Sequence, residues 1–129
     1  MRAFAALAGL LSGLVLQALP AHADYYGQYL AEISARDLRN SNGQLLTSVA
    51  AILRQDRANV HRYGIVDRFD EIDGLFDDAG LRADLEAAVA GSVVPSDLAR
   101  SIRAGNARVR VEIYGSGNRL DYVKIHRAD

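Results

Sequence analysis

The stretch RVRVEIYGSGNRLDYVKIH, residues 108–126, decides the fold of this protein. Valine and isoleucine alternate with charged residues on both sides of a Gly-Ser-Gly-Asn cluster, and this pattern is typical of a β-hairpin. An isolated hairpin is only marginally stable in water, so it must pack on helices or gain a third strand. Tyr29, Ala31 and Ile33 alternate in the same way, and residues 29–33 are the predicted third strand.

The register of the hairpin has two alternatives in the sequence. A four-residue loop brings apolar residues together but sets Glu112 against Asp121. A five-residue loop also pairs apolar residues but sets Arg110 against Lys124. Because like charges directly opposite each other destabilise a sheet, neither loop is favoured, and the register stays open at this point.

Between the predicted strands, apolar residues recur at the spacing of α-helices. The longest run predicts a helix over 44–63, which follows a turn at residues 40–43 and ends at Gly64. Three more helices are predicted: one from Asp67 that buries Phe69, Ile72 and Phe76, one capped by Asp77 or Asp78 and ended by Gly91, and one from Pro95 to Gly105. The predicted fold is α+β, with several short helices packed on a small antiparallel sheet built around the C-terminal β-hairpin.

The first 23 residues have the pattern of a secretory signal peptide. Arg2 is followed by an apolar run that ends at Leu19, and Pro20 then breaks the helix. Ala21 and Ala23 are small residues at the −3 and −1 positions of a signal peptidase site. The apolar run is at the lower limit of the length that spans a bilayer, which favours a cleaved signal over an anchor.

We therefore predict a signal peptide over residues 1–23 and a mature chain that starts at Asp24. Residues 24–129 are enough for one small α+β domain and too few for two. The expected location is the periplasm or the extracellular space, with no stable membrane anchor after cleavage. The chain has no cysteine, which excludes disulfides and lipid attachment at a lipobox cysteine.

The charge balance excludes one class of partner. The 15 cationic and 16 acidic side chains leave a net charge of −1, and removal of residues 1–23 takes away only the cation Arg2. Proteins that bind nucleic acids usually have a clear basic excess. We therefore predict no nucleic-acid partner.

Asp56 is the catalytic candidate of the sequence. It falls in the apolar stripe of the predicted helix over 44–63, so its carboxylate is expected to be buried and to need hydrogen-bond donors. On a structural interpretation, it accepts from a loop backbone or an arginine and joins two elements. On a catalytic interpretation, it is the general base of a small hydrolase or isomerase.

Beside that stripe, one side of the same predicted helix carries three neighbouring residues: Arg54, Arg57 and His61. Together they are candidates to bind a phosphate, a sulfate or a carboxylate. The alternative is a polar helix edge that faces solvent.

The acidic stretch over residues 67–78 invites a comparison with calcium-binding loops. With Gly74 at the sixth position of an EF-hand, Phe69 and Gly80 occupy the first and last ligand positions, and neither offers a carboxylate. These acids are better interpreted as helix caps and first-turn charges. No metal site and no cofactor is predicted.

Three segments, NSNGQL (40–45), RQDRAN (54–59) and HRYG (61–64), resemble a group of small exported bacterial proteins of unknown function. The resemblance implies export and a common fold, and it implies no activity. The sequence also lacks the usual nucleophile motifs. It thus favours a non-catalytic binding or accessory protein of the cell envelope, with an envelope protein or a small ligand as its unidentified partner. A small enzyme that uses Asp56 and an anion-binding module are the alternatives.

Export makes a direct prediction about the mature N-terminus. Mass spectrometry of the protein from its native host should find a chain that begins at Asp24. Replacing Ala23 with phenylalanine should block processing, because signal peptidase accepts only small side chains there. An uncleaved chain in the membrane fraction would contradict the signal-peptide assignment.

Overall fold

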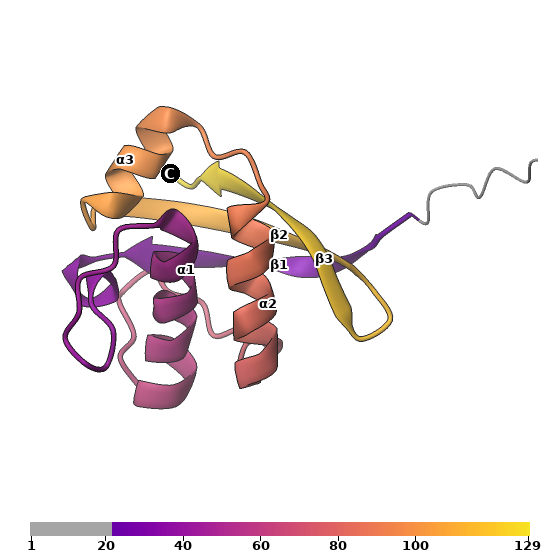
Figure 1. Ribbon diagram of the computed structural model, residues 1–129, viewed down its shortest axis with the longest axis horizontal. Coiled ribbons are helices and arrows are strands. Elements are labelled where there is room, and N and C mark those ends of the chain that lie inside the picture. Colours follow the sequence, from indigo (N-terminus) through magenta and orange to yellow (C-terminus); the bar gives the residue numbers. More distant parts are fainter. Residues whose placement is uncertain (1–21) are drawn as a thin grey trace, which may run out of the picture.

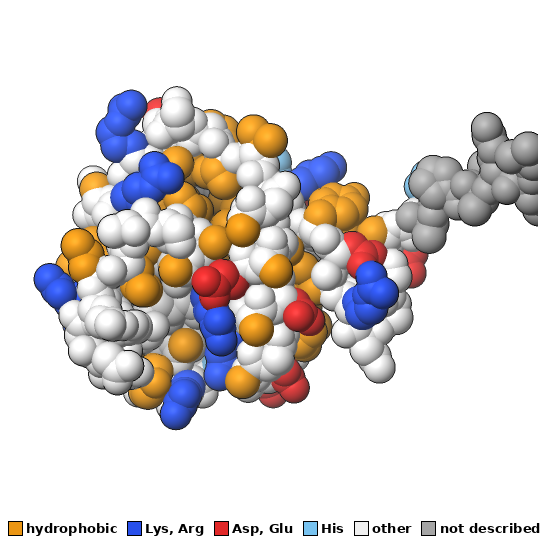
Figure 2. All heavy atoms as spheres, in the orientation of Figure 1, with side chains coloured by type: hydrophobic (Ala, Val, Ile, Leu, Met, Phe, Trp, Pro, Cys, Tyr) orange, Lys and Arg blue, Asp and Glu red, His pale blue; other side chains and the backbone are white. Residues whose placement is uncertain are grey.

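The computed structural model describes residues 22–129, in which helices pack on one face of a three-stranded antiparallel sheet (Figure 1). The elements are β1 (Asp24–Ile33), the 3-10 turn η1 (Ala35–Leu38), α1 (Val49–Ala58), the π-helical turn η2 (Asn59–Tyr63), α2 (Ala79–Ala90), α3 (Ser96–Arg103), β2 (Ala107–Ser116) and β3 (Arg119–Arg127). The predicted α+β fold is confirmed. The predicted signal peptide lies, up to Ala21, outside the described residues. The face shown in Figure 2 carries cationic, acidic and apolar side chains in mixture, without a large patch of one charge sign.

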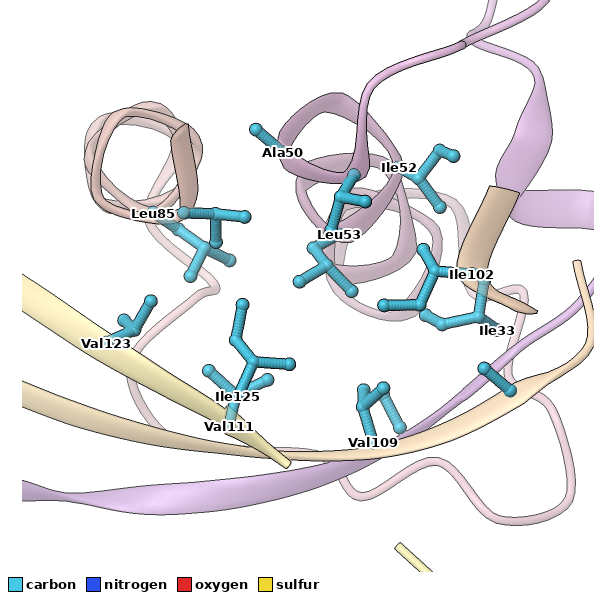
Figure 3. Packing of buried hydrophobic residues seen from close by; sticks show 14 of the residues in the cluster. Ile33, Ala50, Ile52, Leu53, Leu85, Ile102, Val109, Val111, Val123 and Ile125 are labelled. Atoms are coloured by element: carbon cyan, nitrogen blue, oxygen red, sulfur yellow. The ribbon is translucent and has the colours of Figure 1, made fainter. Parts of the chain in front are cut away.

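The sheet has the strand order β1-β2-β3, so the N-terminal strand pairs with the hairpin as predicted. β1 begins earlier than expected, at Asp24, and lies antiparallel to β2 with Tyr29 opposite Val111. The alternating apolar residues of all three strands point to the helices. Figure 3 shows Val109 and Val111 of β2 and Ile125 of β3 beneath Leu53 of α1 and Leu85 of α2.

Both predicted hairpin registers are wrong. The structure pairs Ile113 with Val123 and Val111 with Ile125, so that each apolar pair faces the helices. In this register Glu112 lies opposite Lys124, and the two opposite charges replace the like-charged pairs of both predicted registers.

A short turn and a bulge make this register possible. Ser116 pairs with Arg119, so the turn contains only two residues, and its first residue, Gly117, has the positive φ of 60° that such a turn needs. The register shifts between Tyr114 and Gly115, where β3 carries an extra residue. A uniform ladder, which both predictions assumed, does not allow for this residue.

The helix predicted over 44–63 begins later in the structure than the sequence pattern indicated. Asn40 accepts hydrogen bonds from the backbone N–H groups of Asn42 and Gln44, and this turn keeps residues 40–44 out of the helix. The helix starts only at Val49, after Ser48 has capped it by accepting from the N–H of Ala51.

The C-terminal end of that helix is as predicted at Gly64, which has a left-handed φ of 67°. The caps of two later helices also agree with the sequence. Asp78 caps α2 by accepting from the N–H of Leu81, and Pro95 directly precedes α3.

The helix predicted from Asp67 does not form. Phe76 is buried as expected, but Ile72 is 73% exposed and Phe69 is 40% exposed. Carboxylates in this segment accept hydrogen bonds from backbone N–H groups: Asp70 accepts from Asp67, and Asp73 accepts from Phe76. These local bonds compete with helical ones, so residues 67–76 form an irregular loop.

Gly115 provides a test of the bulge. A Cβ atom there would clash with the carbonyl oxygen of Arg119 and lie 2.5 Å from the ring of Tyr26. Gly115→Ala should therefore lower the free energy of unfolding by about 1–3 kcal/mol in urea melts. Gly74→Ala is the matched control, since no atom lies within 4 Å of its added Cβ, and it should change stability by less than about 0.5 kcal/mol. Equal effects of the two substitutions would contradict the assigned geometry.

Candidate functional site

Asp56 and Arg57 are consecutive residues of α1, and both side chains are fully buried. The Nε group of Arg57 donates a hydrogen bond of 2.7 Å to Oδ2 of Asp56. Consecutive helical positions point about 100° apart, so burial of both requires that α1 be covered over a wide arc. The burial of Asp56 was predicted from its position in the apolar stripe. The burial of Arg57 was not, because Arg57 was expected at the polar edge of the helix.

Arg57 joins α1 to the loop over residues 67–76. Its Nη1 group donates to the carbonyl oxygen of Glu71 and to Oδ1 of Asp73, each at 2.8 Å. Its Nη2 group lies 4.0 Å from Asp70, and its guanidinium lies 4.2 Å from the centre of the Tyr29 ring on β1. One side chain thus connects a helix, a loop and a strand.

Asp73 is the second centre of what we call the buried ionic cluster, which consists of Asp56, Arg57, His61, Asp70 and Asp73. Its Oδ1 atom lies 2.8 Å from Nε2 of His61, and its Oδ2 atom accepts from the N–H groups of Leu75 and Phe76. Burial alone would raise the pKa of Asp73, but the hydrogen bonds with His61, Phe76, Arg57 and Leu75 outweigh it and lower that pKa. Asp73 is therefore an ionised partner for Arg57.

Burial and the neighbouring charges shift the pKa values of Asp56 and Arg57. Burial raises the pKa of Asp56, and the adjacent Arg57 acts in the opposite direction. Burial would lower the pKa of Arg57, but Asp56 and Asp73 outweigh it and keep the guanidinium charged. A buried cation of this kind is stable only with several acceptors around it, which the cluster supplies.

A second buried carboxylate lies at η1. Asp37 accepts hydrogen bonds of 2.9 Å from the N–H of Ser34 and from the side-chain amide of Asn59 in η2. Burial raises the pKa of Asp37 to about 6. The sequence analysis missed this residue, although Ser34 three positions before an acid is a capping-box signal that marks it.

The acidic loop closes the C-terminal part of the outer edge of β1. Glu71 donates its N–H to the carbonyl oxygen of Leu30, and its carboxylate accepts from the N–H of Leu30, each at 2.9 Å. Asp70 accepts from the N–H of Glu32 at 2.8 Å. These acids serve as acceptors for a strand edge, and residues 22–129 contain no group of three or more His, Cys, Asp or Glu side chains that could hold a metal ion.

The three residues predicted to bind an anion all face carboxylates of the chain itself. Arg54 donates to Glu86 of α2 at 2.7 Å, at a partly exposed position. Arg57 and His61 meet at Asp73, where both side chains are almost completely enclosed. The structure therefore brings Arg57 and His61 together on one acid, and it pairs Arg54 with another.

An open cavity of about 480 Å³, which we call the α2 cleft, lies between the N-terminal half of α2 and the tip of the hairpin. Its apolar lining consists of Tyr26, Leu75, Phe76, Leu81, Ile113 and Leu120. The carboxylates of Asp78 and Asp84 and the guanidinium of Arg119 supply charged groups. The volume lies in the range of about 300–1,000 Å³ that is typical of small-molecule sites. The sequence pattern did not indicate this cleft, because it joins residues from three segments that lie far apart in the chain.

No family model, curated protein or solved structure matches the chain. Among the helices of residues 22–129, none is both long enough and apolar enough to cross a membrane.

The cluster predicts a large effect of removing Asp56. Asp56→Ala leaves the cation of Arg57 buried with one close carboxylate instead of two, and this should cost about 3 kcal/mol of stability in urea melts. Asp56→Asn should cost less, since the amide keeps an acceptor oxygen for Nε of Arg57. Asp84→Ala, at an exposed position of α2, is the control and should change stability by less than about 0.5 kcal/mol. Equal urea midpoints for Asp56→Ala and wild type would exclude a structural role.

The raised pKa of Asp37 implies that the stability of the protein depends on pH. Its raised pKa means that it takes up a proton more readily in the folded than in the unfolded chain, so its contribution favours folding as the pH falls. Between about pH 7 and pH 5, the wild type should gain about 1 kcal/mol relative to Asp37→Asn. Urea melts of both proteins at the two pH values measure the difference, and parallel responses would contradict the raised pKa.

Proposed function

We propose that the protein is an exported, non-catalytic binding domain of the cell envelope and that it holds a small apolar ligand in the α2 cleft. The observation that supports this proposal is a difference in solvent exposure between two candidate sites. The catalytic candidate Asp56 exposes none of its surface, whereas the α2 cleft is open to solvent.

The enclosure of Asp56 argues against the enzyme alternative. A general base must come within hydrogen-bond reach of the proton that it removes. Asp56 is instead held against Arg57 at 2.7 Å, inside the contact between α1 and the acidic loop. Its position suits a structural ion pair.

The chemistry of the α2 cleft supports binding. Its lining is mainly apolar, with Asp78, Asp84 and Arg119 as its charged residues. One wall is fixed, because the hydroxyl of Tyr26 donates to the carbonyl oxygen of Gly117 at the hairpin tip. Asp78 is engaged as the cap of α2, which leaves Asp84 and Arg119 as the charged groups nearest to an incoming ligand. A small and mainly apolar ligand fits this arrangement.

The position at which β1 begins supports the proposed export. β1 begins at Asp24, directly after the predicted cleavage position. Cleavage there would remove no residue of any described helix or strand. The proposed location is the periplasm or the extracellular space.

A cleft-filling substitution tests the binding function. Small apolar compounds should bind to the wild type in ligand-observed NMR, and Leu81→Trp should weaken that binding about tenfold or more by occupying the cavity. Leu45→Trp is the control: this leucine is 58% exposed and does not line the cleft, so binding should be unchanged.

Two results would contradict the proposed function. One is the absence of any compound that distinguishes wild type from Leu81→Trp. The other is a hydrolase or isomerase activity of the purified protein that Asp56→Asn abolishes while the fold stays intact, because the enclosed carboxylate would then be catalytic.

A further inference from the structure

The two outer edges of the sheet differ. The C-terminal part of the β1 edge is closed by the loop over residues 67–76, which bonds to the backbone of Leu30 and Glu32. β3 forms the opposite edge, and within the part of the chain that the structure describes its backbone has hydrogen-bond partners on β2 alone. One row of N–H and C=O groups along Arg119–Arg127 is therefore free to pair with another strand.

Space for a further chain lies beside this free edge. Two hollows of about 440 and 410 Å³ run along β3, between the strand and the segment that connects α2 to α3. Val93 of that segment is 94% exposed and lines the first hollow together with Ile125. Pro95 and His126 line both hollows, so the two are adjacent.

We propose that the free edge of β3 binds an extended peptide of alternating acidic and apolar residues, which adds a fourth strand to the sheet. This site goes beyond the proposed function, because it shares no argument with the α2 cleft. Backbone hydrogen bonds would supply affinity, and the side chains beside β3 would supply selectivity.

The alternation of β3 determines the chemistry of the peptide. Val123 and Ile125 are buried on the helix side, and both line the hollow that Val93 also lines. The Lys124 side chain points to the opposite face, where its Nζ atom lies 5.2 Å from the centre of the Tyr114 ring. An added strand alternates in step with its neighbour, so one set of its side chains lies beside Lys124 and the other beside Ile125 and Val93. Acidic side chains suit the first position, and apolar side chains suit the second.

A second copy of this chain is a poorer occupant. Of the cations on β3, Arg119 faces Asp121 and Arg127 faces Asp97, whereas Lys124 has no ion pair among the described residues. Antiparallel pairing of β3 with itself about Lys124 would set this lysine against its own copy, and like charges directly opposite each other destabilise a sheet. A lysine on a free edge is a common protection against such self-association, and it does not oppose an acidic partner.

Hydrogen exchange with synthetic peptides tests this site. The probe is a soluble peptide of alternating Glu and Val, and the control probe has Lys in place of Glu. The Glu peptide should slow exchange of β3 amides about tenfold or more at saturation, while amides of β1 stay unchanged. The Lys peptide should have no such effect.

Charge reversal sharpens the test. Lys124→Glu should weaken binding of the Glu peptide about tenfold and should allow the Lys peptide to bind. Arg62→Glu reverses an exposed cation outside β3 and should leave both results as in the wild type.

The proposed peptide site is contradicted if neither peptide slows hydrogen exchange of the β3 amides, or if both peptides slow it equally. It is also contradicted if Lys124→Glu and Arg62→Glu have the same effect on peptide binding. A further contradicting result is a concentration-dependent dimer in analytical ultracentrifugation whose formation slows hydrogen exchange of the β3 amides. The strand bound at β3 would then belong to a second copy of the chain.

Discussion

The guanidinium group of Arg57 is enclosed by protein on all sides and contacts three carboxylates, one carbonyl oxygen and one aromatic ring. Removing such a cation from water costs several kcal/mol, and only a dense set of acceptors offsets that cost. These acceptors come from α1 itself and from the loop over residues 67–76. The loop must therefore fold back against the helix before the charge is satisfied. The same folding brings Phe76 against the ring of Tyr29 in the core.

The position of this loop divides the sheet into a closed and an open side. On the closed side, Asp70 and Glu71 bond to the backbone of β1, and Arg57 donates to the carbonyl oxygen of Glu71. On the open side, β3 has a row of backbone groups that pair with nothing within residues 22–129, and the hairpin tip forms one wall of the α2 cleft. The buried charges thus lie on one side, and both proposed binding sites lie on the other.

Local patterns predicted the hairpin, the third strand, the fold class and the caps of the later helices, because each depends on residues close in sequence. The burial of Asp56 also followed from helical spacing. The hairpin register did not, because the bulge beside Gly115 adds one residue to β3. The burial of Arg57 depends on acids 13 to 16 positions away, whose arrangement exists only after the loop has folded. For the same reason, the acids of residues 67–76 were mistaken for a helix start.

The way in which the loop is held also constrains how this sequence can diverge. A loop fixed by main-chain bonds tolerates almost any side chain, whereas this loop depends on the identities of Arg57, His61 and Asp73. A single exchange at one of these positions leaves a charge or a ring nitrogen enclosed without its partner. Viable descendants should therefore change these positions together or keep all of them, and joint variation of positions 57, 61 and 73 would be the evolutionary record of a contact between distant parts of the chain.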